Sequence, residues 1–288
     1  MKPREITVIS GKGGTGKTTL TASLIPFLEN PVIADCDVDA PDLHILLDPR
    51  EESRESFSGG NRARINPELC TSCGLCREAC RFGAVTSAPE FRIDRRLCEG
   101  CGVCELVCPQ GAVTFSPEEA GRLYSSSTAF GPLIHARLHP GEETSGKLVS
   151  LVRERARKKA EEEGRTLILA DGSPGIGCSV ISSITGASLA LIVTEPHTAA
   201  LHDLERLADL TQRLSVPAAA VINKADLSPE LCERTEAFCR SRNLPVLMKI
   251  PFSGEIVRAL GKRKIPSLEN PVLYSRLGIQ RLADHISR

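Results

Sequence analysis

A glycine-rich stretch near the start of the chain places the strongest constraint on its fold. Residues 11–19 read GKGGTGKTT, which satisfies the pattern G-x-x-x-x-G-K-[ST]. The apolar run from Ile6 to Ile9 precedes this stretch and is typical of a strand, and residues 20–28 follow it with the character of a helix. A strand, a glycine-rich turn and a helix in this order predict a loop that binds nucleotide phosphates.

The residue types of this loop have separate roles in phosphate binding. Glycine lets the backbone turn tightly and direct its N–H groups at phosphate oxygens. We expect Lys17 to reach the β- and γ-phosphates and the Thr18 hydroxyl to bind Mg²⁺. The residues of the loop expected to contact the nucleotide are Gly11, Lys12, Gly13, Gly14, Thr15, Gly16, Lys17, Thr18 and Thr19.

Strand and helix patterns alternate along much of the chain. Buried strands are expected at 31–39, 166–171, 189–194, 218–223 and 246–250, and helices at 146–163, 201–214, 230–242 and 272–286. This alternation predicts an α/β fold with a mostly parallel sheet covered by helices on both faces. Asp35, Asp37 and Asp171 lie at or just after strand ends, where open α/β sheets place their active sites.

Eight of the twelve cysteines form an internal repeat. The spacing C-x₂-C-x₂-C-x₃-C occurs at Cys70, Cys73, Cys76 and Cys80, and again at Cys98, Cys101, Cys104 and Cys108, each shifted by 28 positions. Gly74 matches Gly102, and residues 83–85 match 111–113. A fixed offset indicates two copies of one small structural unit. Residues 51–61, before the repeat, are polar and rich in Gly and Ser, as a linker would be.

The doubled cysteine spacing resembles that of bacterial two-cluster ferredoxins, in which the fourth cysteine of each run ligates the other cluster. Pro109 follows Cys108 as in that family, whereas Arg81 follows Cys80. Zinc also takes four cysteines and is the alternative metal, but the second run and the repeat argue against it. The resemblance implies one [4Fe–4S] centre held by Cys70, Cys73, Cys76 and Cys108, and another held by Cys98, Cys101, Cys104 and Cys80.

These motifs predict two domains. An α/β phosphate-loop domain is expected to comprise residues 1–60 and 117–288. A small α+β ferredoxin domain is expected as an insertion at residues 61–116.

The phosphate loop also resembles that of the MinD/ParA/Mrp ATPases, which carry an additional lysine, here Lys12. The resemblance implies a Mg²⁺-dependent ATPase that forms a nucleotide-sandwich dimer, in which Lys12 of one subunit touches phosphates bound by the other. Asp37 resembles the switch I aspartate that positions the attacking water, and Asp171 resembles the Walker B aspartate near Mg²⁺. The expected catalytic residues are Lys12, Lys17, Asp37 and Asp171, with Thr18, Asp37 and Asp171 around Mg²⁺.

Two later segments resemble the part of this superfamily that binds the base. Asn223 follows the apolar residues 220–222 and matches the asparagine on the adenine side. Pro251 and Phe252 match the loop that closes over the base.

Composition excludes several classes of partner. Lys plus Arg and Asp plus Glu both number 36, so there is no basic excess for nucleic acid or an anionic membrane surface. We find no apolar run near the roughly 18 residues of a membrane span, and the chain enters its first strand without a leader, so a cytoplasmic location is expected. Twelve cysteines in such a setting indicate metal rather than disulfides.

Two functional hypotheses follow. The first is an ATP-gated redox protein, in which ATP binding and hydrolysis control electron transfer through two [4Fe–4S] clusters to a partner protein. The alternative is an Mrp-like protein that assembles or carries iron–sulfur or other metal cofactors. In both cases the sandwich dimer forms either between identical chains or with a similar ATPase.

Overall fold

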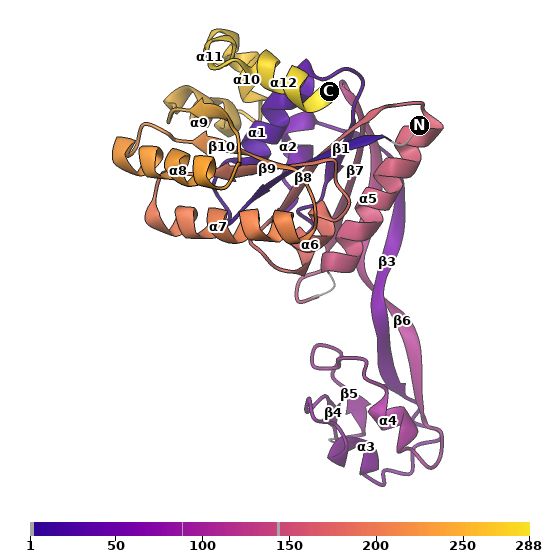
Figure 1. The fold of residues 1–288 in the computed structure, drawn as a ribbon. Coiled ribbons are helices and arrows are strands. Elements are labelled where there is room, and N and C mark those ends of the chain that lie inside the picture. The colour runs from indigo at the N-terminus through magenta and orange to yellow at the C-terminus, as the bar shows by residue number, and fades with distance from the viewer. Residues whose placement is uncertain (1–2, 88, 143–144) are drawn as a thin grey trace. The chain divides into compact units, whose positions relative to one another are not determined.

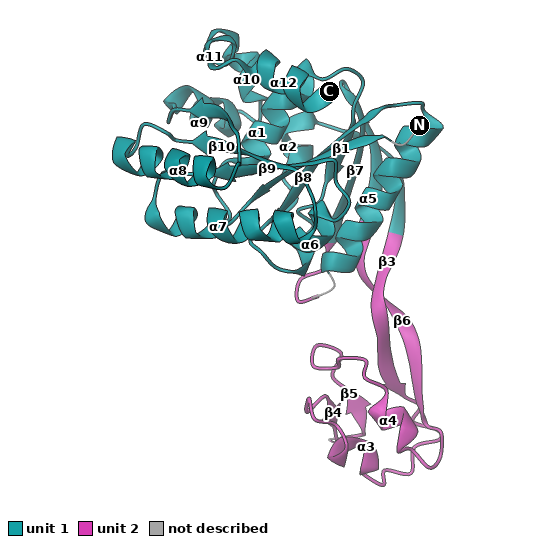
Figure 2. Ribbon diagram, viewed as in Figure 1, with its two compact units in different colours: residues 1–55, 123–137, 145–288 teal, residues 56–122, 138–144 magenta. Residues whose placement is uncertain are grey.

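The computed structural model describes residues 3–87, 89–142 and 145–288. The chain forms two compact units, which Figure 2 shows in different colours. The first contains residues 1–55, 123–137 and 145–288, and the second contains residues 56–122 and 138–144. The chain leaves the first unit within one long strand, β3, and returns to it within another, β6.

In the part of the chain that the structure describes, nine strands form one sheet in the order β11-β10-β9-β1-β8-β2-β7-β6-β3. All pairings from β11 through to β7 are parallel, which confirms the expected mostly parallel α/β fold. The strands are β1 (Arg4–Ser10), β2 (Val32–Asp35), β3 (Arg50–Ile65), β6 (Val113–Thr128), β7 (Gly131–Leu138), β8 (Leu167–Pro174), β9 (Leu189–Thr194), β10 (Ala218–Asn223) and β11 (Val246–Ile250).

Helices cover both faces of this sheet (Figure 1). The helices of the first unit are α1 (Lys17–Leu24), continued by a 3₁₀ turn (Ile25–Phe27), α2 (Leu43–Leu47), α5 (Ser145–Glu162), α6 (Cys178–Ile184), α7 (Thr198–Arg213), α8 (Pro229–Ser241), α9 (Gly254–Gly261), α10 (Pro266–Glu269), α11 (Pro271–Leu277) and α12 (Ile279–Ser287). No helix in the described part of the chain is long and apolar enough to span a membrane.

The alternation of side chains along β1 separates the two apolar cores. Val8 packs into a core with α1, α2, α11 and α12, whereas its neighbour Ile9 packs into a core with α6, α7 and α8. Both side chains are fully buried. Successive residues of a strand point to opposite faces, so β1 is covered by helices on each side.

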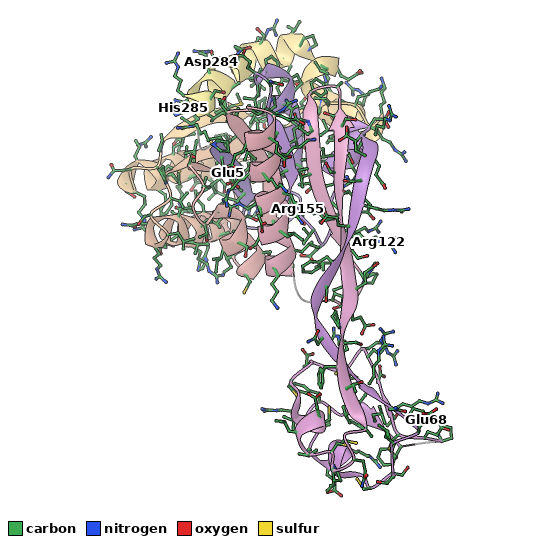
Figure 3. All side chains as sticks on the ribbon, turned by 90° about the vertical axis from the view of Figure 1, so that its right-hand side faces the viewer. Glu5, Glu68, Arg122, Arg155, Asp284 and His285 are labelled. Carbon is green, nitrogen blue, oxygen red and sulfur yellow. The ribbon has the colours of Figure 1, made fainter. Side chains whose placement is uncertain are left out.

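Buried ion pairs fix α5 against the start of β1. Glu5 of β1 is almost fully buried, and its carboxylate accepts hydrogen bonds from Arg153 and Arg157 of α5. Figure 3 shows Glu5 beside this helix. Removing Glu5 would leave the buried Arg153 guanidinium without its carboxylate, so these ion pairs hold α5 in one register.

Two expectations about secondary structure are wrong. Residues 51–61 do not form a linker, because they belong to the 16-residue strand β3 at the end of the sheet. The single helix expected at 272–286 is two helices, α11 and α12, which meet at Gly278. The backbone of Gly278 is left-handed, with a φ of 78°, and this ends α11.

The second unit is built from two copies of the same segment. Its elements are α3 (Leu75–Glu78), β4 (Val85–Thr86), β5 (Arg92–Ile93) and α4 (Val103–Leu106), so α4 lies 28 residues after α3. Gly74 and Gly102 precede these helices with nearly the same φ, 85° and 84°. The copies exchange equivalent hydrogen bonds, because Asn66 N donates to Ala112 O and Asp94 N donates to Ala84 O, each at 2.7 Å.

Candidate nucleotide site and cysteine sites

Two glycines with left-handed backbone shape the glycine-rich loop between β1 and α1. Gly14 and Gly16 have φ angles of 81° and 90°, which glycine adopts without strain. Gly16 also passes close to β10, since a Cβ added there would lie 2.3 Å from Nδ2 of Asn223. Asn223 donates a hydrogen bond of 2.8 Å from this nitrogen to Thr15 O, so the loop is fixed from the adjacent strand end.

The loop is closely packed at Gly11 but not at Gly13. A Cβ on Gly11 would overlap Asp203 of α7, whereas a Cβ on Gly13 would meet no atom within 4 Å. The hydroxyl of Thr15 donates to Lys12 O at 3.4 Å. The loop is therefore confined at Gly11 and Gly16 and open at Gly13.

Lys17 and Thr18, at the start of α1, converge on Asp171 of β8. The Lys17 ammonium lies 2.9 Å from Asp171 Oδ1, and the Thr18 hydroxyl donates to Asp171 Oδ2 at 2.6 Å. Thr21, one turn further along α1, donates to Oδ1 at 3.0 Å. Lys17 and Asp171 are both buried, and the three donors fix the position of this carboxylate. The motif does not predict a role for Thr21. Its position four residues after Lys17 nevertheless places it on the same face of the helix.

Two more carboxylates follow β2. Asp35 is fully buried and accepts backbone hydrogen bonds from Asp37 N and Leu43 N, so it shapes the segment between β2 and α2. The carboxylate of Asp37 lies 3.6 Å from the Lys17 ammonium. Three carboxylates therefore surround one cation.

Burial and this excess of negative charge raise the pKa of two of these groups. Burial, reinforced by the charge of Asp171, raises the pKa of Asp37 to about 6 against the opposing effect of Lys17. Burial and Asp171 also raise the pKa of Asp35. Burial opposes the charge of Lys17, but the neighbouring carboxylates outweigh it and raise the pKa of this ammonium.

Lys12 contacts a second group of charged and polar side chains, which lies just after β9. The sequence motifs do not indicate this group. Its ammonium lies 2.6 Å from His197 Nε2 and 3.9 Å from Glu195 Oε2. Glu195 also accepts a 2.5 Å hydrogen bond from Lys224. Glu195 directly follows β9, so it occupies the same kind of strand-end position as Asp35 and Asp171. This position is the sequence signal that indicates it as a site residue.

One pocket is lined by the residues that are expected to surround the base. Asn223, Pro251 and Phe252 are found there, together with Gly14, Gly16 and Thr19 of the phosphate loop. Val193, Ile256 and Tyr274 give the pocket apolar walls. Phe252 is half exposed, and its backbone N–H donates to Asp226 Oδ1 at 2.6 Å. A pocket that joins the phosphate loop and has apolar walls suits a flat base.

The cysteines of the second unit gather in two places. Cys70, Cys73 and Cys76 of the first run line one cavity together with Cys108, the last cysteine of the second run. Cys80, the last cysteine of the first run, packs in one cluster with Cys98, Cys104 and Cys108 of the second run, so Cys108 belongs to both places. Cys101 is exposed.

Backbone amides surround some of these sulfurs. Ala112 N donates to Cys108 Sγ at 3.3 Å. Burial opposes ionisation of Cys108, but several backbone N–H groups outweigh it and lower the pKa of this thiol. Burial raises the pKa of the Cys76 and Cys104 thiols. Within the described ranges, no group of three or more His, Cys, Asp or Glu side chains could hold a metal ion.

The chain that forms this strand–loop–helix site is similar to known proteins in sequence and in fold. Residues 6–266 match the model of the CobQ/CobB/MinD/ParA nucleotide binding domain. The chain belongs to this family.

Among relatives of this CobQ/CobB/MinD/ParA family member, the uncharacterized protein MJ0578 of Methanocaldococcus jannaschii is 36% identical over 227 residues, which cover 78% of this chain and 79% of the relative. The fold is similar to that of the cell division ATPase MinD of Pyrococcus furiosus, with a TM-score of 0.60, 19% identity, and coverage of 99% of this chain and 98% of that one. MinD of Pyrococcus horikoshii, complexed with Mg-ADP, has a TM-score of 0.60 and 16% identity, with coverage of 99% and 96%.

Proposed function

We propose that this protein binds and hydrolyses ATP as a nucleotide-sandwich dimer and carries two [4Fe–4S] clusters that pass electrons to a partner protein. Nucleotide occupancy would control that transfer. The observation that carries the redox part is the single cavity lined by Cys70, Cys73, Cys76 and Cys108, because it joins cysteines from both repeats.

The nucleotide part rests on the donors around the phosphate loop. Lys17 and the N–H groups of the loop offer positive charge to the phosphates, and Pyrococcus horikoshii MinD, which shares this fold, was solved with Mg-ADP. Thr18, Asp37 and Asp171 supply hydroxyl and carboxylate oxygens, the ligands that Mg²⁺ prefers, so these residues fit the ion. Bound Mg²⁺ would neutralise charge on the phosphates.

Asp37 has the properties needed to position a water molecule for hydrolysis. It follows β2, it is close to Lys17, and its pKa of about 6 leaves it mainly ionised at pH 7. A carboxylate with a pKa near the working pH accepts a proton more readily than an ordinary aspartate does. Lys12 is half exposed at the surface of the site, where it could reach phosphates bound by a second subunit.

The cavity lining supports iron–sulfur clusters as the ligand of these cysteines. Cys70, Cys73 and Cys76 come from the first run and Cys108 from the second, and in two-cluster ferredoxins the fourth cysteine of each run ligates the other cluster. When bound, such clusters would supply one-electron chemistry. The backbone N–H group of Ala112, which donates to Cys108 Sγ, is a donor of the kind that would tune the potential of a cluster held there.

Chain connectivity supports coupling of the two activities. Asp35 accepts a hydrogen bond from Leu43 N at the start of α2, and β3 begins at Arg50, three residues after α2 ends. β3 then leads to the cysteine repeats. A nucleotide that reorders the segment from Asp35 to Leu43 would therefore act close in sequence to the strand that leads to the second unit.

The proposal is tested on anaerobically purified protein. We expect about eight iron and eight sulfide per chain for two cubanes, an EPR signal after reduction, and MgATP hydrolysis that Lys17→Ala removes. Protein with zinc in place of iron would contradict the redox part. Transfer of the clusters to an apo-acceptor would instead favour the assembly or carrier role.

A further inference from the structure

A groove runs along β11, the strand at one end of the nine-stranded sheet. Its volume is about 940 Å³, and it is lined by every residue from Asn243 to Lys249. One wall comes from α8, through Glu236, Cys239 and Arg240, and the other from the segment that joins α11 to α12. The groove lies within the first unit and includes no residue of the phosphate loop.

The backbone of β11 is available on its outer side. Among the described residues the strand pairs with β10 alone, and a strand at the end of a sheet directs half of its N–H and C=O groups outward. Proteins usually protect such edges with charge. The opposite end of the sheet is protected in this way, because five of the six residues 50–55 of β3 are charged. In β11 only Lys249 is charged.

The floor and rim of the groove differ in chemistry. Leu244 and Met248 are buried, and Val246, Leu247 and Leu277 are partly buried along it. Among the described residues that line it, one is acidic, Glu236, and four are basic, namely Arg240, Lys249, Arg276 and Arg281.

The positive charge of the rim is only partly compensated. Lys249 and Arg240 share the carboxylate of Glu236, at 2.7 Å and 3.8 Å. In the described part of the chain, no carboxylate forms an ion pair with Arg276 or Arg281. Both arginines are exposed. The groove therefore favours a ligand that is anionic along its length.

We propose that this groove binds an extended, acidic peptide segment of a partner protein, which adds to β11 as a further strand. Main-chain hydrogen bonds to β11 give the affinity, apolar side chains of the peptide contact the floor, and its carboxylates pair with the rim arginines. Acidic residues that alternate with apolar ones match this arrangement, since side chains alternate between the two faces of a strand. This site does not depend on the proposed redox function.

The test uses the full-length, anaerobically purified protein and a fluorescein-labelled peptide of about eight residues in which Glu alternates with Val, a length that spans the groove. Fluorescence anisotropy should show saturable binding. The same peptide with N-methyl groups at every second residue keeps its charge but loses main-chain donors, and it should bind at least tenfold more weakly.

Two variants locate the site. The double variant Arg276→Glu, Arg281→Glu should weaken binding at least tenfold. Arg206→Glu with Arg213→Glu makes the same change of charge on exposed positions of α7 and should alter the affinity less than twofold. Circular dichroism melting would show that both proteins fold. The proposal is overturned if the peptide does not bind, if N-methylation has no effect, or if a single-stranded oligonucleotide of equal charge binds as tightly, since only charge would then be recognised.

Discussion

The ammonium nitrogen of Lys17 lies 3.6 Å from Oδ2 of Asp37. The same ammonium contacts Asp171, and Asp35 lies buried nearby, so a single cation balances three carboxylates. This excess of negative charge affects Asp37: burial and the charge of Asp171 raise its pKa to about 6. The nucleotide site is thus arranged at the expense of the stability of the fold.

Replacement of Asp37 by Asn should stabilise the protein without nucleotide at neutral pH. The pKa of the Asp37 carboxyl is higher in the folded state, about 6, than in the unfolded state, near 3.8. Its contribution to stability is therefore fully present below pH 3.8 and is lost as the pH rises through about 6. The stabilisation by Asp37→Asn should therefore be absent at pH 4 and reach up to about 3 kcal/mol above pH 6. Urea denaturation across this pH range measures it, and Asp284→Asn on α12 serves as the control. A pH-independent difference would contradict the assigned cause.

Two glycines of the loop should respond differently to alanine. A Cβ at Gly16 would lie 2.3 Å from Asn223 Nδ2, and the φ there is 90°, so Gly16→Ala should lower stability by about 1–3 kcal/mol. Gly13 has open space around it, so Gly13→Ala should fold with a melting temperature close to that of the unmodified protein. Thermal melts without nucleotide compare the two directly. Equal loss of stability in both would show that the loop geometry is not as described.

Replacement of Lys12 should impair formation of the dimer without weakening the binding of ATP to a single chain. Its ammonium is half exposed and contacts His197 and Glu195, whereas Lys17 is buried in the site. We expect Lys12→Ala to keep the ATP affinity within about threefold while it lowers ATP-dependent dimerisation and hydrolysis at least tenfold. Sedimentation velocity and steady-state hydrolysis measure the two effects. A variant that hydrolyses ATP normally would remove Lys12 from the mechanism.

One cysteine substitution tests the exchange of ligands between the repeats. Cys108 lines the same cavity as Cys70, Cys73 and Cys76, so Cys108→Ser should perturb the cluster of the first run. We expect loss of about four iron per chain or a changed EPR signal. Cys178→Ser, at an exposed cysteine outside the repeats, should keep the full iron content. The assignment fails if Cys108→Ser leaves both iron content and spectrum unchanged.

Local sequence was a good guide to the buried parallel strands. Residues 189–194, 218–223 and 246–250 are strands within the expected bounds, because continuous apolar runs of this length have few alternatives in an α/β chain. The contact of Lys17 with Asp171 also follows from the motif, since parallel strands bring their carboxyl ends to one edge of the sheet.

Features set by long-range pairing were not predictable in the same way. The polar residues 51–61 have the composition of a linker, but pairing with β6 makes them strand. Gly278 interrupts an amphipathic pattern that otherwise reads as one helix. By sequence, Thr21 is an ordinary residue of α1 and His197 an ordinary residue before α7, and only the folded chain brings them to Asp171 and Lys12.

The central claim is that nucleotide occupancy changes the behaviour of the clusters, and the most direct measurement is of the clusters themselves. The midpoint potentials and the rate of electron transfer to a soluble acceptor should be determined with MgATP, with MgADP and without nucleotide. We expect the MgATP state to differ from the other two by at least about 30 mV or threefold in rate, and Lys17→Ala to abolish the difference. Identical potentials and rates in all three states would contradict the claim and leave two independent functions in one chain.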